Sequence, residues 1–264
     1  MTEATPPCVE VDTHSNGVVE LVLSRPEALN ALSLGMLDDL RDAVESVRRD
    51  RPRVVVLSSA CERAFSVGAD LKERSSMSAA ELLAARPQMV AGYRCLLGVD
   101  CPVVAAIHGY CLGGGLELAL TCDVLVCERD SILGFPEVTI GIIPGGGGTQ
   151  LVARRAGWGT SADLLFSGRR ISGAEAAALG VIDRLVDEDA TGAALDFAGS
   201  VARNSPAATR AAKRALTGGW NLPLHEALDI EDKAFREVLS GPDREEGLRA
   251  FRDKNEPHWP SALD

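Results

Sequence analysis

The hydrophobic pattern of the first two thirds of the chain alternates short apolar runs with helical periodicity. Val18–Leu23 and Val54–Ser59 are rich in β-branched residues and predict two strands. Between them, Ser33–Arg49 repeats leucine and valine at helical spacing, and Ser33 is in position to cap the first turn. The three segments together predict a β-α-β unit.

The same alternation continues beyond this unit. Val103–Ile107 and Val124–Cys127 predict further strands, and helices are predicted over Ser78–Leu97 and from Leu116 to Leu120. Alternating strands and helices are typical of a layered α/β domain, in which active sites collect at strand ends. We therefore expect an α/β fold.

The C-terminal third is predominantly helical in pattern. A short strand is expected over Val181–Val186, and the predicted helices are Ala162–Phe166, Ser172–Leu179, Thr191–Asn204, Pro206–Thr217, Leu224–Leu239 and Arg244–Lys254. Ser-Pro, Gly-Gly and Gly-Pro pairs separate the last four helices. We expect an α/β core over residues 1–200 and a helical region over residues 201–264.

Composition and charge exclude several classes of protein. With 264 residues, 46% of them hydrophobic, the chain can bury a large core. A net charge of −11 argues against general binding to nucleic acid or to anionic membranes. No apolar run is long enough to span a bilayer, and the N-terminus lacks the features of a signal peptide. We expect a cytoplasmic protein.

Cysteine and histidine usage does not favour a metal site. The seven cysteines are odd in number and form no C-x-x-C pair, which argues against zinc and disulfide frameworks. Cys111, Cys122 and Cys127 are interpreted as small core residues, and His108, at the end of an apolar run, as a structural imidazole. The glycine run Gly145–Gly148 lacks the lysine of a P-loop. We expect no metal and no bound nucleotide cofactor.

Two isolated acidic residues carry the candidate chemistry. Glu117 follows three consecutive glycines within Ala105–Asp123, and Glu137 is the only charge within Gly134–Gln150. Glycines expose backbone N–H groups, and a helix of one turn would bring Glu117 to the same side as the Gly114 amide. A buried carboxylate either finds hydrogen-bond donors or gains proton affinity. The alternative is that the glutamates only cap or orient neighbouring backbone.

Four blocks in the same order and spacing identify a family resemblance. They are Ser24–Leu32, Ala64–Glu73, the glycine block around Glu117, and Pro136-Glu137. Over nearly its whole length the chain resembles the enoyl-CoA hydratase/isomerase (crotonase) superfamily. The resemblance implies a ββα spiral core with a helical C-terminal oligomerisation region.

The resemblance also implies a role for each matching site residue. The backbone N–H groups of Ala69 and Gly114 match the pair that binds the thioester oxygen, and Glu117 and Glu137 match the two catalytic glutamates. These groups imply addition of water across the 2,3 double bond of a short or branched 2-enoyl-CoA. Isomerases of the superfamily commonly keep only the carboxylate that corresponds to Glu137, so the presence of both favours hydration.

Coenzyme A is implied as part of the substrate, with no separate cofactor. The resemblance assigns its binding to Arg25, Glu27, Ala28, Leu29, Gly68, Ala69, Asp70, Leu71, Lys72, Gly113, Gly114, Phe251 and Lys254. Arg25, Lys72 and Arg74 are candidate phosphate ligands, and ordinary solvated charge is the alternative for each. The segment 251–254 resembles one that reaches a neighbouring subunit's nucleotide, in a family that assembles as trimers or dimers of trimers.

Within the superfamily, three segments look most like the methylglutaconyl-CoA hydratase branch. They are Asp70–Arg74, Leu116–Leu120 and Ile143–Gln150. The chain departs from the usual pattern at Leu151–Ala153, where an arginine normally comes first, and at Ser66-Val67. Acyl-group preference therefore stays open.

Three activities remain compatible with these residues. Hydration comes first, an isomerase or other crotonase-type activity second, and a non-catalytic acyl-CoA-binding protein third. Relatives of the methylglutaconyl-CoA hydratase branch can bind RNA, but Asp38–Asp50 mixes acids with bases and forms no basic stripe. We expect an acyl-CoA thioester as the ligand, without nucleic-acid or membrane partners.

Overall fold

A computed structural model describes residues 7–262 of the chain. A six-stranded sheet in the order β1-β2-β3-β5-β7-β10 forms the centre of the molecule. Its strands are β1 (Val9–Thr13), β2 (Val18–Leu23), β3 (Val54–Ser59), β5 (Val103–Ile107), β7 (Val124–Glu128) and β10 (Arg184–Val186). Only β1 is antiparallel to its neighbour. Strands β2, β3 and β5 are buried on both faces, as a parallel sheet covered on both sides requires.

Helices surround this sheet and continue beyond it. The α-helices are α1 (Leu34–Arg49), α2 (Leu71–Ser75), α3 (Ala79–Arg94), α4 (Gly114–Ala119), α5 (Gly148–Ser167), α6 (Gly173–Ala178), α7 (Ala190–Ala202), α8 (Pro206–Gly219), α9 (Leu224–Leu239) and α10 (Pro242–Asp253). Short 3-10 turns are η1 (Pro26–Ala28), η2 (Cys95–Gly98), η3 (Pro136–Ile140) and η4 (Pro260–Ala262).

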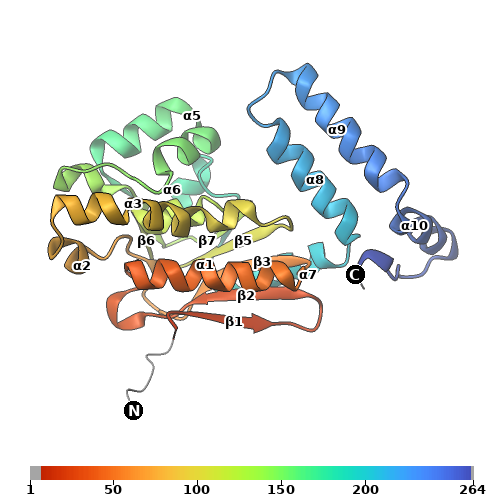
Figure 1. The fold of residues 1–264 in the computed structure, drawn as a ribbon, viewed down its shortest axis with the longest axis horizontal. Helices are drawn as coiled ribbons and strands as arrows, with labels where there is room; N and C mark the ends of the chain where they lie inside the picture. Colours follow the sequence, from red (N-terminus) through yellow and green to blue (C-terminus); the bar gives the residue numbers. More distant parts are fainter. Residues whose placement is uncertain (1–6, 263–264) are drawn as a thin grey trace, which may run out of the picture.

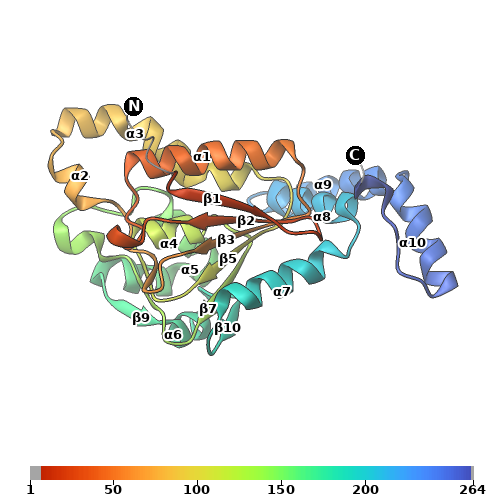
Figure 2. The same ribbon diagram turned by 90° about the horizontal axis from the view of Figure 1, so that it is seen from below.

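The two faces of the sheet carry different helices. Figure 2 shows α1 and α3 on one face and α7 on the other. Strand β3 alternates between them, because Val55 and Leu57 pack into the core under α1 while Val54 and Val56 pack against α7. Helix α7 presents alanines at intervals of four residues, so its backbone approaches the sheet closely.

A second, four-stranded sheet lies where the chain leaves the first one. Its strands are β4 (Ala64–Ser66), β6 (Tyr110–Leu112), β8 (Ile132–Gly134) and β9 (Arg170–Ser172). Strands β3, β5 and β7 of the large sheet are each followed by one short strand and then by α2, α4 or η3. This repeated strand-strand-helix unit gathers three helix starts at one edge of the molecule.

The C-terminal helices stand away from this body. Helices α8 and α9 form an antiparallel pair that projects from the sheet, and α10 lies at the end remote from α2 (Figure 1). One buried side chain ties the region to the body, and another holds the region together. Arg210 donates to the carbonyls of Arg51 and Pro52, and Asp243 accepts hydrogen bonds from Ser205 and Ser261. None of the described helices combines the length and apolarity needed to cross a bilayer.

The long elements confirm the sequence predictions, and three segments correct them. Ser33 caps α1 by accepting from the Met36 N–H, as expected. Helix α5 begins at Gly148 instead of residue 162, because a kink at Gly157 (φ 76°) interrupts the periodicity. The strand predicted over residues 181–186 is confined to β10, because the amides of Val181 and Ile182 close the end of α6. Helix α4 covers 114–119, two residues earlier than predicted at its start.

Candidate active site

A cavity of about 840 Å³ opens at the edge where the short helices begin. Of the residues predicted to bind substrate, its walls contain Arg25, Glu27, Ala28, Leu29, Ala69, Asp70, Leu71, Lys72, Gly113, Gly114 and Glu137. Gly68, Glu117, Phe251 and Lys254 do not line it. Residues from all four sequence blocks that carry the family resemblance therefore line one cavity.

Two backbone N–H groups in this wall have no acceptor. Ala69 lies between β4 and α2, Gly114 is the first residue of α4, and neither amide donates to any residue within 7–262. Gly68 keeps the two segments together, because it has φ +90° and a Cβ there would lie 2.9 Å from the Gly114 nitrogen. The pair is available to bind an oxygen atom from a ligand.

Glu117 is buried behind the cavity and is held by the start of α5. Its Oε1 accepts hydrogen bonds from the amides of Gly146 (2.7 Å), Gly147 (2.9 Å) and Gly148 (2.7 Å). Three donors at a helix N-terminus fix a carboxylate in place. These donors come from a loop about 30 residues further along the chain. That Glu117 and the Gly114 amide face one ligand stays a prediction.

Glu137 has the opposite surroundings. Its Oε2 is buried without a hydrogen-bond partner among the described residues, and its Oε1 lies 2.8 Å from where a Cβ on Gly113 would stand. Burial raises the pKa of Glu137 to about 7, and the nearby charge of Glu117 adds to the shift. This carboxyl group can therefore exchange a proton near neutral pH.

The basic residues of the cavity wall differ in whether they are already paired with an acidic residue. Arg25 Nη1 donates to Asp70 Oδ2 (2.6 Å) and to the Ala31 carbonyl (2.9 Å). It therefore braces the segment that carries Ala69, and its guanidinium is already paired. Lys72 is exposed and makes no ion pair within the described part of the chain. Arg170 on β9 is a further cation of the wall that the sequence analysis missed.

Two more residues of the site were missed because their role depends on packing. Tyr93 is buried on α3, and its hydroxyl occupies the space that a Cβ on Gly114 would need. Its ring lies similarly close to Gly146. Arg74, considered above only for phosphate binding, is half-buried, and its Nε and Nη2 atoms are shielded from solvent. In the sequence Tyr93 and Arg74 look like ordinary helix residues. Only the glycine run 145–148 indicated a site in this part of the molecule.

The other reactive side chains do not form a competing site. All seven cysteines are free, and burial raises the pKa of Cys111 well above its usual value. His108 contacts the Cys61 carbonyl at 2.8 Å, in agreement with its interpretation as a structural imidazole. Within residues 7–262, His, Cys, Asp and Glu side chains form no group of three that could hold a metal ion.

Phe251 and Lys254 lie outside the cavity. Phe251 is exposed near the end of α10, and Lys254 follows that helix with φ +54°. In Figure 1, α10 and α2 are at opposite ends of the molecule. The same chain therefore does not bring these two residues to its own cavity.

Comparison with known proteins shows the family to which the chain belongs. Residues 13–262 match the family model for enoyl-CoA hydratase/isomerase. Methylglutaconyl-CoA hydratase from Mus musculus is 36% identical over 255 residues, 94% of this chain and 81% of the relative. Enoyl-CoA hydratase domain-containing protein 2 from Homo sapiens is 36% identical over 249 residues, 92% of this chain and 85% of the relative.

A solved structure extends the similarity to the whole fold. The enoyl-CoA hydratase from Bacillus anthracis superposes with a TM-score of 0.92 at 37% identity, covering 96% of this chain and 98% of that one. A match of this extent includes the strand-strand-helix units and the C-terminal helices. The chain belongs to the enoyl-CoA hydratase/isomerase family.

Proposed function

We propose that the protein is a hydratase that adds water across the 2,3 double bond of a short or branched 2-enoyl-CoA thioester. One observation carries the proposal: a carboxyl group with a pKa of about 7 and an unpartnered oxygen faces a cavity in which two amides lack acceptors. Coenzyme A enters as part of the substrate, so no separate cofactor is proposed.

The two amides supply the electrostatic part of the mechanism. When water attacks C3 of the conjugated thioester, negative charge moves onto the thioester oxygen. The N–H groups of Ala69 and Gly114 hydrogen-bond that oxygen and stabilise the enolate. Each such donor contributes roughly 3 kcal/mol in a site that excludes water.

The glutamates divide the proton transfers. Glu117, held at Oε1, offers its other oxygen to the attacking water and accepts a proton as the C3–O bond forms. Glu137 delivers its proton to C2, which completes the addition of one water molecule. A proton passes from Glu117 to Glu137 through solvent before the next turnover.

Coenzyme A is proposed to lie along the η1 and α2 side of the cavity. Ala28, Leu29 and Leu71 offer apolar wall there, and Lys72 is a cation free to meet a phosphate. Since Arg25 is paired with Asp70, we propose that it supports the wall instead of binding phosphate directly.

Hydration is tested by the loss of conjugated thioester absorbance with crotonyl-CoA. Glu117→Gln and Glu137→Gln should each reduce kcat by several orders of magnitude while binding of a saturated acyl-CoA survives. Glu188→Gln, which alters an exposed glutamate, is the matched control and should leave turnover unchanged.

Other outcomes would favour the other activities. Migration of the double bond without incorporation of heavy oxygen from labelled water would mean an isomerase. Binding without turnover, unaffected by either glutamine substitution, would mean a non-catalytic acyl-CoA-binding protein. Near wild-type kinetics in both variants would contradict the proposed mechanism.

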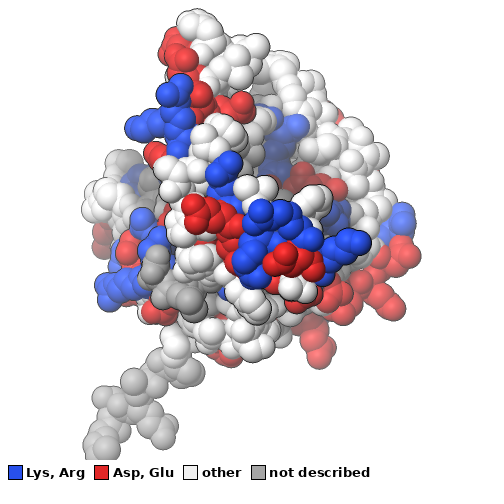
Figure 3. Space-filling model, turned by 90° about the vertical axis from the view of Figure 1, so that its right-hand side faces the viewer, with Lys and Arg blue, Asp and Glu red and all other residues white. Residues whose placement is uncertain are grey.

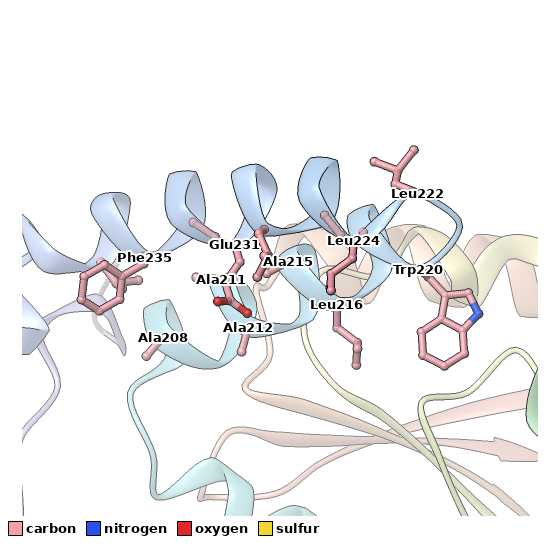
Figure 4. A pocket seen from close by; sticks show the side chains of 15 residues that line it. Ala208, Ala211, Ala212, Ala215, Leu216, Trp220, Leu222, Leu224, Glu231 and Phe235 are labelled. Atoms are coloured by element: carbon pink, nitrogen blue, oxygen red, sulfur yellow. The ribbon is translucent and has the colours of Figure 1, made fainter.

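We further propose that the helices of residues 201–264 form the oligomerisation region, in a trimer or a dimer of trimers. An apolar groove of about 630 Å³ lies between α8 and α9, lined by Leu216, Leu224 and Phe235 among others (Figure 4). These side chains are 63%, 75% and 58% exposed. Apolar side chains exposed together in one patch are typical of an interface, whereas single ones occur on any surface. The face at the α10 end mixes acidic and basic side chains without one dominant sign (Figure 3).

In such an assembly Phe251 and Lys254 would complete the coenzyme A site of a neighbouring subunit. Mixing inactive Glu137→Gln subunits with Lys254→Ala subunits under exchange conditions tests this. Sites that combine an intact Glu137 with a neighbour's intact Lys254 should restore kcat/KM above that of either parent. An unchanged average of the two parents would contradict the shared site.

A further inference from the structure

The buried Tyr93 side chain lies between two glycines that belong to different parts of the candidate site. A Cβ on Gly146 would stand 2.7 Å from Tyr93 Cγ, and a Cβ on Gly114 would meet the Tyr93 hydroxyl oxygen. Because neither glycine has a side chain, Tyr93 packs directly on both backbones. The base of its ring contacts one segment and its hydroxyl contacts the other.

Each of these two glycines carries an amide of the site. Gly114 supplies one of the two amides that lack an acceptor within residues 7–262, and the Gly146 N–H donates to Glu117 Oε1 at 2.7 Å. Helix α4 joins the backbones of Gly114 and Glu117, but the Glu117 carboxylate is held by a loop outside that helix. Tyr93 is a contact between this loop and the start of α4.

The position of Tyr93 is fixed by the packing of α3. At the preceding residue, Gly92, a Cβ would stand 2.6 Å from the Leu37 Cβ, so α3 lies directly on α1. Earlier on α3, Arg86 donates to the Gly145 carbonyl. Helix α3 therefore contacts the loop that binds Glu117 at two points, and Tyr93 has little freedom to move.

The Tyr93 hydroxyl acts through its size and not through a charge. Burial raises the pKa of Tyr93 to about 12, so the hydroxyl stays neutral over the pH range of an ordinary assay. Tyr93 does not line the cavity, so a direct contact with the substrate is not part of its role.

Building on the proposed hydratase function, we propose that Tyr93 is a positioning residue that keeps the Gly114 amide and the Glu117 carboxylate at a fixed relative position. The base of the ring supports the loop that orients Glu117, and the hydroxyl limits the movement of the start of α4. A misplacement of about 1 Å in a reacting group can cost roughly 100-fold in rate, so this contact affects turnover without touching the substrate.

A double-mutant cycle on Tyr93 and Gly114 tests the proposal. Tyr93→Phe removes only the hydroxyl and should lower kcat for crotonyl-CoA by about 5-fold with KM nearly unchanged. Gly114→Ala alone places its Cβ against the hydroxyl. In the double variant that space is free, so about 10-fold of the kcat lost in Gly114→Ala should be regained.

Two other glycines provide matched controls. A Cβ on Gly146 would meet the Tyr93 ring at Cγ, which Tyr93→Phe retains. The losses of kcat in Gly146→Ala and Tyr93→Phe should therefore combine without rescue. Gly159 lies in an open position on α5, so Gly159→Ala should show no coupling to Tyr93→Phe.

A second measurement reports on the Gly114 amide without addition of water. Acetoacetyl-CoA is a 1,3-dicarbonyl compound, and its enolate carries charge on the thioester oxygen and absorbs in the near ultraviolet. Amides that bind this oxygen increase the enolate fraction of the bound ligand. Gly114→Ala should lower the enolate absorbance of the complex, and addition of Tyr93→Phe should restore part of it.

Several results would overturn the role of Tyr93. One is a Tyr93/Gly114 cycle that is additive in both kcat and enolate absorbance. If Gly114→Ala does not fold, wild-type kcat and enolate absorbance in Tyr93→Phe decide against the role. Loss of stability in Tyr93→Phe with unchanged enolate absorbance also does so, since that marks a purely structural residue.

The two measurements separate this inference from the hydratase proposal. Hydration of crotonyl-CoA with an additive cycle contradicts the role of Tyr93 alone. Rescue of the enolate absorbance in a protein that hydrates no 2-enoyl-CoA contradicts the hydratase proposal and leaves the role of Tyr93 standing.

Discussion

At the scale of residues, two glutamates in one site have different surroundings. Glu117 receives three amide hydrogen bonds on a single oxygen, whereas Glu137 keeps a buried oxygen without a partner. Hydrogen-bond donors hold the first carboxylate still, and burial favours the proton on the second. Identical side chains can therefore take different parts in one reaction.

The raised pKa of Glu137 predicts the pH dependence of hydration. If Glu137 must carry a proton to deliver it to C2, kcat/KM should be level below pH 7 and fall about 10-fold per unit above it. A profile of kcat/KM for crotonyl-CoA between pH 5 and 9 provides the measurement. A rise in kcat/KM through pH 7 would show that Glu137 acts as the base in this direction.

Gly114 is predicted to tolerate no side chain. A Cβ would overlap the Tyr93 hydroxyl, so Gly114→Ala should displace either Tyr93 or the start of α4. The displaced amide should lower kcat by about 100-fold, comparable to loss of one oxyanion donor. Gly159→Ala, in an open position on α5, is the control and should stabilise the protein slightly. If Gly114→Ala keeps wild-type kcat, this amide does not bind the reacting oxygen.

At the scale of elements, short helices fix the site because each begins directly beside a functional residue. Helix α2 follows Ala69, α4 begins with Gly114, and η3 contains Glu137. Their orientation is set by caps and by the small sheet, since elements of five or six residues have little stability of their own. The proposed chemistry therefore depends on local hydrogen bonds at these helix starts.

Asp70 should contribute strongly to the stability of this arrangement. It caps α2 through the amides of Lys72 and Glu73 and pairs with Arg25. Asp70→Ala should lower the free energy of unfolding by about 2–4 kcal/mol at pH 7, and Asp70→Asn, which can keep the cap, by less. Urea unfolding measures both, with exposed Asp130→Asn as the control.

The same carboxylate makes this stabilisation dependent on pH. Burial opposes ionisation, but Arg25 and the two amides outweigh it and lower the pKa of Asp70 from its usual value. A lowered pKa stabilises the fold above the unfolded-state value and loses that effect as the pH falls through the folded-state value. The gap between wild type and Asp70→Ala should therefore narrow below pH 4. A constant gap would mean that Asp70 acts through packing instead of charge.

The sequence predicts long elements better than short ones. Strands β2, β3 and β5 and helix α9 agree residue by residue with their patterns, because five or more residues reveal a period. The strands of the small sheet have three residues each and depend on partners far along the chain, so no local signal marks them. Only the second half of helix α5 was predicted, because its glycine-rich start and its kink hide the helical period.

The site could be predicted in composition but not in geometry. Glu137, Ala69 and Gly114 line the cavity and Glu117 lies buried behind it, since glycine and isolated acid in apolar sequence mark a special position. The donors to Glu117 come from a distant loop, and Tyr93 matters only because it packs on glycine. Contacts of this kind follow from tertiary structure. The catalytic roles themselves remain proposals for the experiments above.

At the scale of the whole molecule, the projecting helices leave apolar side chains without cover. The groove between α8 and α9 and the position of Lys254 far from its own cavity fit an assembly in which one chain serves another. Burying such a surface in water is favourable at roughly 25 cal/mol per Å². The proposed oligomer thus accounts for features that have no explanation within one chain.

Charge placed in the groove should dissociate the assembly. Leu224→Glu and Phe235→Glu alter exposed positions, so the single chain should still fold, while an apolar interface would have to bury a carboxylate. Light scattering after size exclusion should show a shift toward monomer, with KM for the thioester raised. Leu83→Glu, equally exposed on α3, is the control and should leave the mass unchanged. A wild-type mass in both groove variants would place the interface elsewhere.

The separation of the α8–α9 pair from the catalytic sheet has a practical consequence. Because the pair touches the body through few anchors such as Arg210, its outward face can diverge without disturbing the glutamates. Exchanging that face between relatives is then a route to hybrid oligomers whose subunits differ in acyl specificity. In such a hybrid, the turnover of each substrate reports on one kind of subunit.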